Sequence, residues 1–144
     1  MKNIIKLEEA AQFVFSLYIL QIRLPFHAWY ILIFFLPDAF AIAYFIGPKA
    51  GAFFYNLSHH KGISLILIAA GFIINSNPIL LYGLLFFSHS CFDRMVGYGL
   101  KFSDSPNHTH LGYIGKEKYR NGNSQNEDSG YPGLSQYERK NEMS

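Results

Sequence analysis

Cysteine, charge and recognisable motifs are all scarce in this sequence of 144 residues. The single cysteine, Cys91, excludes an internal disulfide and a cysteine-rich zinc module. Only 15% of the residues are charged and the formal net charge is +2, so nothing indicates a nucleic-acid partner. The chain has no glycine-rich phosphate loop, dinucleotide fingerprint, serine nucleophile elbow or HExxH spacing. The N-terminal segment has no small-residue cleavage site after a short apolar run, and we therefore expect no signal peptide.

Apolar residues are unevenly distributed along the chain. Residues 1–100 are dominated by Leu, Ile, Phe, Ala and Tyr, whereas residues 116–144 contain almost no aliphatic side chain. Such a tail cannot bury enough apolar surface to offset the entropy lost on ordering. The sequence therefore predicts one domain over residues 1–115 and a disordered polar tail over residues 116–144.

Four apolar stretches predict an all-α integral membrane bundle of four transmembrane helices, because each is near the roughly 20 residues that cross a bilayer. Pro37 predicts a kink inside the second stretch. The third stretch must begin near Gly51 to be long enough, since residues 63–74 alone would span only about 18 Å. An interfacial helix followed by a re-entrant helix is the alternative for this third stretch. The predicted spans are residues 7–24, 28–46, 51–74 and 78–97.

The charged residues between the spans predict an orientation. With four spans, Lys2, Lys6, Lys49 and Lys101 fall on one side of the membrane. By the positive-inside rule, both termini are then cytoplasmic and the protein lies in the inner membrane. We expect membrane lipid as the partner and no nucleic acid. A homo-oligomer is possible. Four helices alone make a thin wall for a transport path, so a carrier would need more than one chain.

Ionisable side chains interrupt three of these apolar spans. They are costly in hydrocarbon, about 2.5–3.5 kcal/mol for a central aspartate, and usually mark a site. From the cytoplasmic ends of their helices, Asp38 lies about 14 Å deep, and His59 and His60 about 12–14 Å. On the last span, His89 lies about 12 Å deep and Asp93 about 6 Å, one helical turn apart on one face. The similar depths predict that these residues meet.

Two or three histidines with two carboxylates suit zinc, manganese or iron. We expect Asp38, His59, His89 and Asp93 to be the metal ligands. His60 is the candidate general acid or base, because imidazole titrates near neutrality. Hydrogen bonding between helices, with no ligand role, explains the same residues without a metal.

Other polar residues near the cytoplasmic side admit two interpretations. Asp93 is followed by Arg94, so the two can form an interfacial ion pair. His108 and His110 can reach back over the cytoplasmic mouth and add ligands, or they belong to a surface loop.

Several short motifs resemble a small bacterial membrane family, domain-of-unknown-function family 4260, over about residues 5–115. The resemblance implies a four-helix integral membrane protein and no particular activity. The segments that carry it are LPD at 36–38, GPKAGA at 47–52, YNLSH at 55–59, SHSCFDR at 88–94, GYGLK at 97–101 and THLG at 109–112.

A looser similarity links the chain to inner-membrane proteins regarded as metal-dependent hydrolases. It implies that Asp38, His59 or His60, His89 and Asp93 are metal ligands. The His-Arg-Gly signature of that group is only approximated here by residues 60–62. The sequence is therefore consistent with two functions. One is a membrane-embedded metal-dependent hydrolase acting on a lipid-linked phosphate or phosphodiester, and the other is a non-enzymatic membrane protein with a polar network or a proton or cation site.

Overall fold

The computed structural model describes residues 2–114, and the chain divides into two units, Met1–Leu111 and Gly112–Ser144. The first unit contains all of the described helices. Of the second unit, only residues 112–114 are described. The tail predicted to be disordered, residues 116–144, lies outside the described residues.

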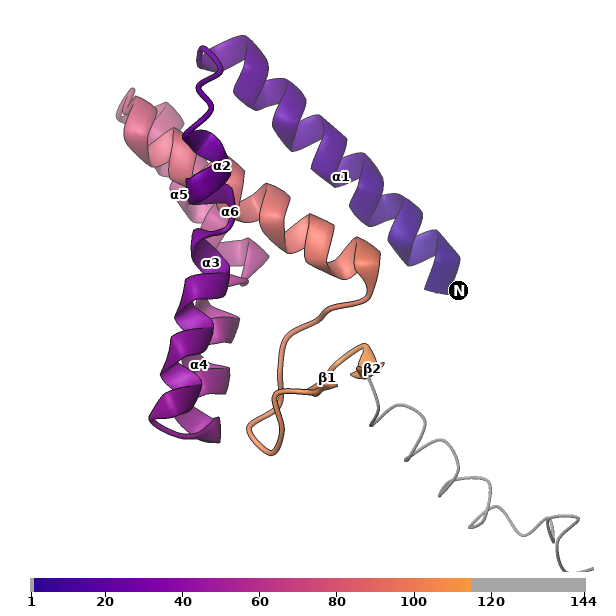
Figure 1. Ribbon diagram of the computed structural model, residues 1–144. Helices are drawn as coiled ribbons and strands as arrows, with labels where there is room; N and C mark the ends of the chain where they lie inside the picture. Colours follow the sequence, from indigo (N-terminus) through magenta and orange to yellow (C-terminus); the bar gives the residue numbers. More distant parts are fainter. Residues whose placement is uncertain (1, 115–144) are drawn as a thin grey trace, which may run out of the picture. The chain divides into compact units, whose positions relative to one another are not determined.

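The described chain is mostly helical, as predicted (Figure 1). Six α-helices and one 3₁₀ helix follow one another, and two-residue strands occur after the last helix. The elements are α1 (Lys2–Arg23), α2 (Tyr30–Phe34), α3 (Leu36–Ala39), η1 (Phe40–Phe45), α4 (Pro48–Ser58), α5 (Lys61–Ile73), α6 (Asn77–Val96), β1 (His108–Thr109) and β2 (Gly112–Tyr113).

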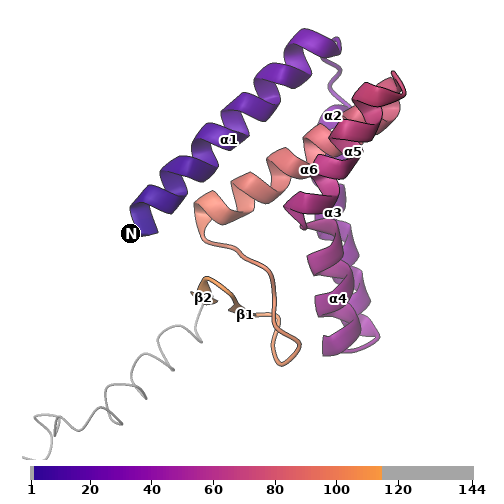
Figure 2. The ribbon, with the colours of Figure 1, turned by 180° about the vertical axis from the view of Figure 1, so that it is seen from behind.

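Helix α6 is the centre of the first unit and packs against α1, α2 and α5 (Figures 1 and 2). Its contact with α5 is close, because a Cβ added at Gly83 would lie only 2.8 Å from the backbone nitrogen of Ile68. A Cβ added at Gly71 would likewise lie 2.6 Å from the backbone nitrogen of Leu80. Small residues at such contacts let helix backbones approach each other. The buried core consists of Leu20, Leu24, Tyr30, Ile33, Leu80, Leu81, Leu84 and Leu85.

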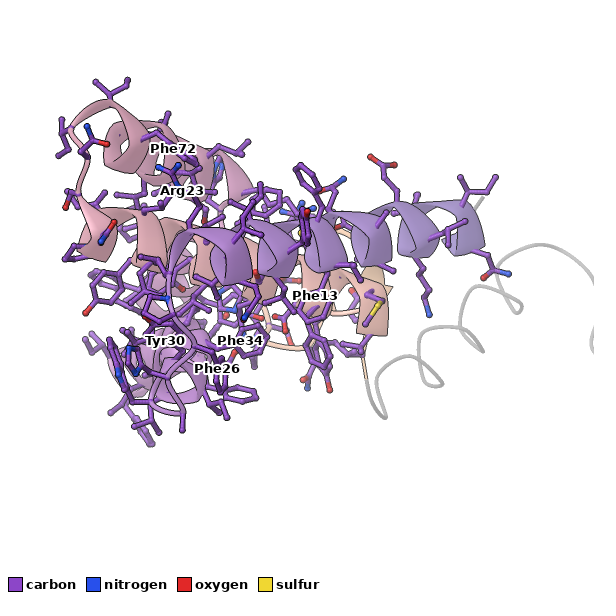
Figure 3. The ribbon with its side chains drawn as sticks, turned by 90° about the horizontal axis from the view of Figure 1, so that it is seen from above. Phe13, Arg23, Phe26, Tyr30, Phe34 and Phe72 are labelled. Atoms are coloured by element: carbon purple, nitrogen blue, oxygen red, sulfur yellow. The ribbon has the colours of Figure 1, made fainter. Side chains whose placement is uncertain are left out.

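Aromatic side chains connect α1 to the helices beside it (Figure 3). The guanidinium of Arg23, at the end of α1, lies 4.9 Å from the ring centroid of Phe72 on α5. Phe13 of α1 meets Phe34 of α2 edge to face, with ring centroids 6.3 Å apart. These contacts fix α1 along the helices that carry the polar residues described below.

Two of the four predicted spans are broken. The kink expected at Pro37 is a full interruption, because α2 ends at Phe34 and the chain continues as α3 and then as the 3₁₀ helix η1. The uninterrupted third helix, predicted over residues 51–74, is wrong, since α4 ends at Ser58 and α5 begins at Lys61. His60 between them has an extended backbone, with φ −82° and ψ 106°. The side chains of Ser58 and His59 both contact the carbonyl of Tyr55, so they hold the helix end in place.

Among the described residues, only α6 is both long enough and apolar enough to cross a membrane. Helix α1 has 22 residues, but it carries Lys6, Glu8 and Glu9. Helix α5 is strongly apolar but has 13 residues, about 20 Å at the standard rise. A bundle of four transmembrane helices is therefore not established by helix lengths.

Candidate metal centre

Three separate elements bring two histidines and two aspartates together. Asp38 is on α3, directly after Pro37, and His59 is in the break between α4 and α5. His89 and Asp93 are one turn apart on α6. One ligand atom from each residue lies within 4.8 Å of the corresponding atoms of the others. We call Asp38, His59, His89 and Asp93 the His–Asp cluster; the prediction that they meet is confirmed.

The distances within the cluster match the spacing of ligands around one ion. The Nε2 atoms of His59 and His89 are 3.2 Å apart. Oδ1 of Asp38 is 3.4 Å from the first nitrogen and 3.3 Å from the second. Asp93 lies 3.4 Å from His59 through Oδ2 and 3.7 Å from His89 through Oδ1. Tetrahedral zinc with bonds of about 2.0–2.1 Å requires ligand atoms about 3.3–3.4 Å apart.

Tyr55 orients two members of the cluster. Its backbone carbonyl lies 2.8 Å from Nδ1 of His59. A carbonyl only accepts hydrogen bonds, so Nδ1 carries a proton and Nε2 is the ring atom that faces the cluster as a candidate ligand. The Tyr55 ring stacks on the His59 ring with centroids 3.8 Å apart, and its hydroxyl donates to Oδ2 of Asp93 at 2.9 Å. Partners of this kind fix the orientation of metal ligands.

Carboxylate oxygens and imidazole nitrogens of the cluster converge on one point. The Nε2 atoms of both histidines lie within 3.7 Å of the carboxylates, and the Tyr55 hydroxyl donates to Asp93. His89 is only 1% exposed, and its Nδ1 has no hydrogen-bond partner among the described residues. The four side chains could hold a divalent cation at this point.

A pocket of about 320 Å³ opens beside the cluster. The side chain of Asp38 is 49% exposed, in contrast to the two buried histidines. Burial lowers the pKa of Lys101 at the pocket wall, and the negative charges of Asp38 and Asp93 oppose that shift. The pocket is lined by Phe35, Asp38, Ala41, Tyr55, His89, Phe92, Asp93, Val96, Tyr98 and Lys101.

The segment that carries Lys101 returns to the cluster after α6. Gly97 ends the helix with φ +102°, a left-handed conformation that favours glycine, and the backbone N–H of Tyr98 donates to the carbonyl of Asp93 at 2.8 Å. Asn56 then binds the Lys101 backbone twice, donating to its carbonyl at 2.8 Å and accepting from its N–H at 2.7 Å. The sequence analysis missed this contact because Asn56 and Lys101 are far apart in the chain.

The remaining predicted histidines do not join the cluster. His60 is exposed, so its catalytic role stays a prediction. Nδ1 of His110 accepts a hydrogen bond from the backbone N–H of Leu100 at 2.8 Å. His108 binds Asp104 at 2.7 Å and holds the pKa of that carboxyl below its usual value. The structure thus places His108 and His110 in the loop contacts of the alternative interpretation.

A second polar group, which the sequence analysis missed, links α1, α5 and α6. Glu9 is 7% exposed, and its two carboxylate oxygens bind Lys61 and Arg94. The Lys61 ammonium also donates to Gln12 at 2.7 Å. We call Glu9, Gln12, Lys61 and Arg94 the Glu9 network. Arg94 therefore pairs with Glu9, and the interfacial Asp93–Arg94 pair considered above is not formed in the described chain.

Comparison with known proteins identifies a family but no characterised relative. No curated protein and no solved structure matches the chain. The model of a family described as a domain of unknown function (DUF4260) matches residues 2–114. This match includes every helix of the described residues and all four residues of the His–Asp cluster. The chain belongs to the DUF4260 family.

Proposed function

We propose that this chain is a multi-pass protein of the inner membrane whose His–Asp cluster binds a divalent transition metal ion for a hydrolytic reaction. One observation carries the proposal, namely the convergence of four ligand atoms from two buried histidines and two aspartates within 4.8 Å of one another. The two histidine nitrogens and two carboxylates suit zinc, manganese or iron. The spacing of 3.2–3.4 Å around the two histidine nitrogens favours zinc.

The exposed apolar surface supports the membrane location. Phe45, Ile46 and Ile73 are 92%, 79% and 81% exposed, and large apolar side chains are exposed along every helix. Soluble monomers seldom expose apolar patches beyond a few hundred Å², whereas lipid covers such surfaces. Membrane lipid is accordingly the partner of these faces. Both termini lie on the cytoplasmic side in this arrangement, as Lys6, Lys49 and Lys101 indicate.

The surroundings of the cluster support hydrolysis. A bound metal lowers the pKa of a coordinated water and polarises a carbonyl or phosphoryl oxygen. Asp38, the most exposed ligand, faces the pocket, so water and substrate reach the cluster from this side. His59 and His89 are buried and held by ring contacts with Tyr55 and Phe34, which keeps their orientation fixed.

The competing function is a non-enzymatic membrane protein in which the same residues form a hydrogen-bond network or a proton site. In this alternative, ring N–H groups of the histidines and the Tyr55 hydroxyl are shared with the two carboxylates. It predicts no metal in the purified protein. The two functions therefore differ in the metal content that they predict for the purified protein.

Metal content tests the proposal directly. Protein purified in detergent is expected to hold about one zinc, manganese or iron ion per chain by inductively coupled plasma mass spectrometry, and His59→Ala and His89→Ala are expected to lose it. His60→Ala and His27→Ala are matched controls, because both histidines are exposed and lie outside the cluster. Equal metal content in all five proteins, or none in any, would refute the metal site.

Hydrolysis is tested separately with two probes, p-nitrophenyl phosphate as a phosphomonoester and bis(p-nitrophenyl) phosphate as a phosphodiester. Metal-loaded protein is expected to release p-nitrophenol, and removal of the metal by a chelator is expected to abolish the release. His60→Ala examines the predicted general acid or base, since this variant keeps the metal centre and should lose activity only if His60 transfers a proton. Full metal occupancy with no hydrolysis would leave a metal-binding protein and reject the enzyme.

A further inference from the structure

Lys101 is the only lysine or arginine among the described residues that line the pocket beside the His–Asp cluster. Its backbone is held by Asn56 on α4 and by an antiparallel bridge to Thr109. Its ammonium lies 3.9 Å from the ring centroid of Tyr55. His59 stacks on the same ring at 3.8 Å, so the imidazole and the ammonium must occupy opposite faces of Tyr55. Lys101 is therefore a fixed cation near the cluster and outside its ligand set.

The charges in and around the pocket favour an anionic ligand. Asp38 and Asp93 contribute two negative charges, and a divalent metal ion would neutralise them. Lys101 then leaves the pocket with a net positive charge. A phosphate monoester carries about −1.5 to −2 at neutral pH and three acceptor oxygens. Lysine is a common binder of phosphate, acting as a point charge.

The pocket also has an apolar side. Phe35, Phe92 and Val96 form part of its wall, and Phe35 and Val96 are 52% and 47% exposed. The wall therefore continues onto the apolar surface that we assign to lipid. A volume of about 320 Å³ is at the lower limit of ligand pockets, so it holds a headgroup and leaves a long chain outside.

We infer that the pocket binds the phosphate group of an amphiphile, a phosphomonoester with an apolar chain, and that Lys101 is its anion-binding residue. This inference rests on the proposed metal site. Hydrolysis of this substrate forms a bond between the water oxygen and phosphorus and breaks the phosphorus–oxygen ester bond. The proton from water goes to the departing alkoxide, so the reaction requires no oxidant or reductant.

Titration calorimetry on zinc-loaded full-length protein in phosphatidylcholine nanodiscs tests the inference, with dodecyl phosphate as the probe. Lys101→Met is expected to weaken binding at least tenfold, and Lys101→Arg is expected to restore most of it. Lys49→Met is the matched control, because Lys49 is exposed and does not line the pocket; its affinity should stay within twofold of the wild type. Inorganic phosphate should bind more weakly than dodecyl phosphate but with the same dependence on Lys101, whereas dodecyl maltoside should show none.

Zinc content measured on the same samples separates the two proposals. Unchanged dodecyl phosphate affinity in Lys101→Met, with zinc retained, overturns the anion site and leaves the metal site intact. Loss of zinc in this variant also overturns the inference, because Lys101 would then support the metal and not the ligand. Wild-type protein that binds none of zinc, manganese and iron rejects the proposed function, and the inference with it. If Lys101→Met does not fold, Lys101→Gln replaces it with the same expected results.

Discussion

The Glu9 network and the His–Asp cluster are two polar groups built against the same helix, and they balance their charges differently. The carboxylate of Glu9 is paired with the cations of Lys61 and Arg94, and Gln12 accepts a further hydrogen bond. In the His–Asp cluster, two carboxylates face two imidazole rings. The first group contains lysine and arginine as permanent cations, whereas the four residues of the second include neither.

The two groups meet at successive residues of α6. Asp93 belongs to the cluster and Arg94 to the Glu9 network. Successive residues of an α-helix point about 100° apart, so one short segment serves two different neighbours. Burial alone therefore does not identify a functional site. The balance of donors, acceptors and charge distinguishes a group that holds helices together from one that binds a ligand.

The largest difference between the two groups should appear in how added metal changes the stability of the protein. Zinc at a thousandfold excess over its dissociation constant is expected to stabilise the wild-type protein by about 4 kcal/mol, because it binds the folded state alone. The measurement is the thermal unfolding midpoint of metal-free protein in detergent, with and without zinc. His89→Ala should show no shift.

Glu9→Gln provides the matched comparison for this zinc effect. The variant alters the Glu9 network and leaves the cluster residues unchanged, so its zinc-induced shift should equal that of the wild type. A shift that disappears in Glu9→Gln would mean that the two groups act as one. The distinction drawn between them would then be lost.

Removal of the Glu9 carboxylate should give the next largest effect. Glu9→Ala is expected to lower the free energy of unfolding by about 3 kcal/mol, because Lys61 and Arg94 would remain partly buried without their anion. Denaturation in detergent measures the loss, and metal content should stay unchanged. Lys6→Ala on the same helix is the control, since Lys6 is exposed and lies outside the network. An equal loss in both variants would remove the structural role of the network.

The hydroxyl of Tyr55 should affect metal affinity more than stability. Tyr55→Phe keeps the ring stacked on His59 but removes the hydrogen bond to Asp93, and zinc affinity is expected to fall about tenfold. Competition with a chromogenic chelator measures the change. Tyr44→Phe is the control, because the Tyr44 hydroxyl is buried without a hydrogen-bond partner among the described residues. Unchanged affinity in Tyr55→Phe would show that the hydroxyl does not orient a metal ligand.

The cluster was predictable from the sequence, but much of its setting was not. Helix rise alone places Asp38, His59 and His89 at one depth, and this argument holds even though two of the predicted helices are broken. The choice between His59 and His60 depends on the break after Ser58, where tertiary contacts override helix periodicity. Local patterns cannot reveal such contacts.

Polar pairs between distant residues could also not be predicted from the sequence. Glu9 and Lys61 are separated by about half of the described chain, and nothing near either residue indicates its partner. Asn56 and Lys101 pair in the same way. The structure shows Lys61 at the first position of an apolar helix, a start that the sequence analysis placed ten residues earlier. A cation there is unfavourable for the helix dipole, and its pairing with Glu9 offsets this cost.

The smallest expected effect concerns metal-free protein. Asp38→Asn is expected to lower the free energy of unfolding by about 1 kcal/mol, because the Asp38 carboxylate lies 3.4 Å and 3.3 Å from the Nε2 atoms of His59 and His89. The effect is small because Asp38 is half exposed and partly solvated. The variant also removes a metal ligand, so its zinc-induced stabilisation should shrink, whereas Glu9→Ala should lose more stability and keep the full zinc effect. An Asp38→Asn variant that keeps the full zinc effect would show that Asp38 is a structural partner of the histidines and not a metal ligand.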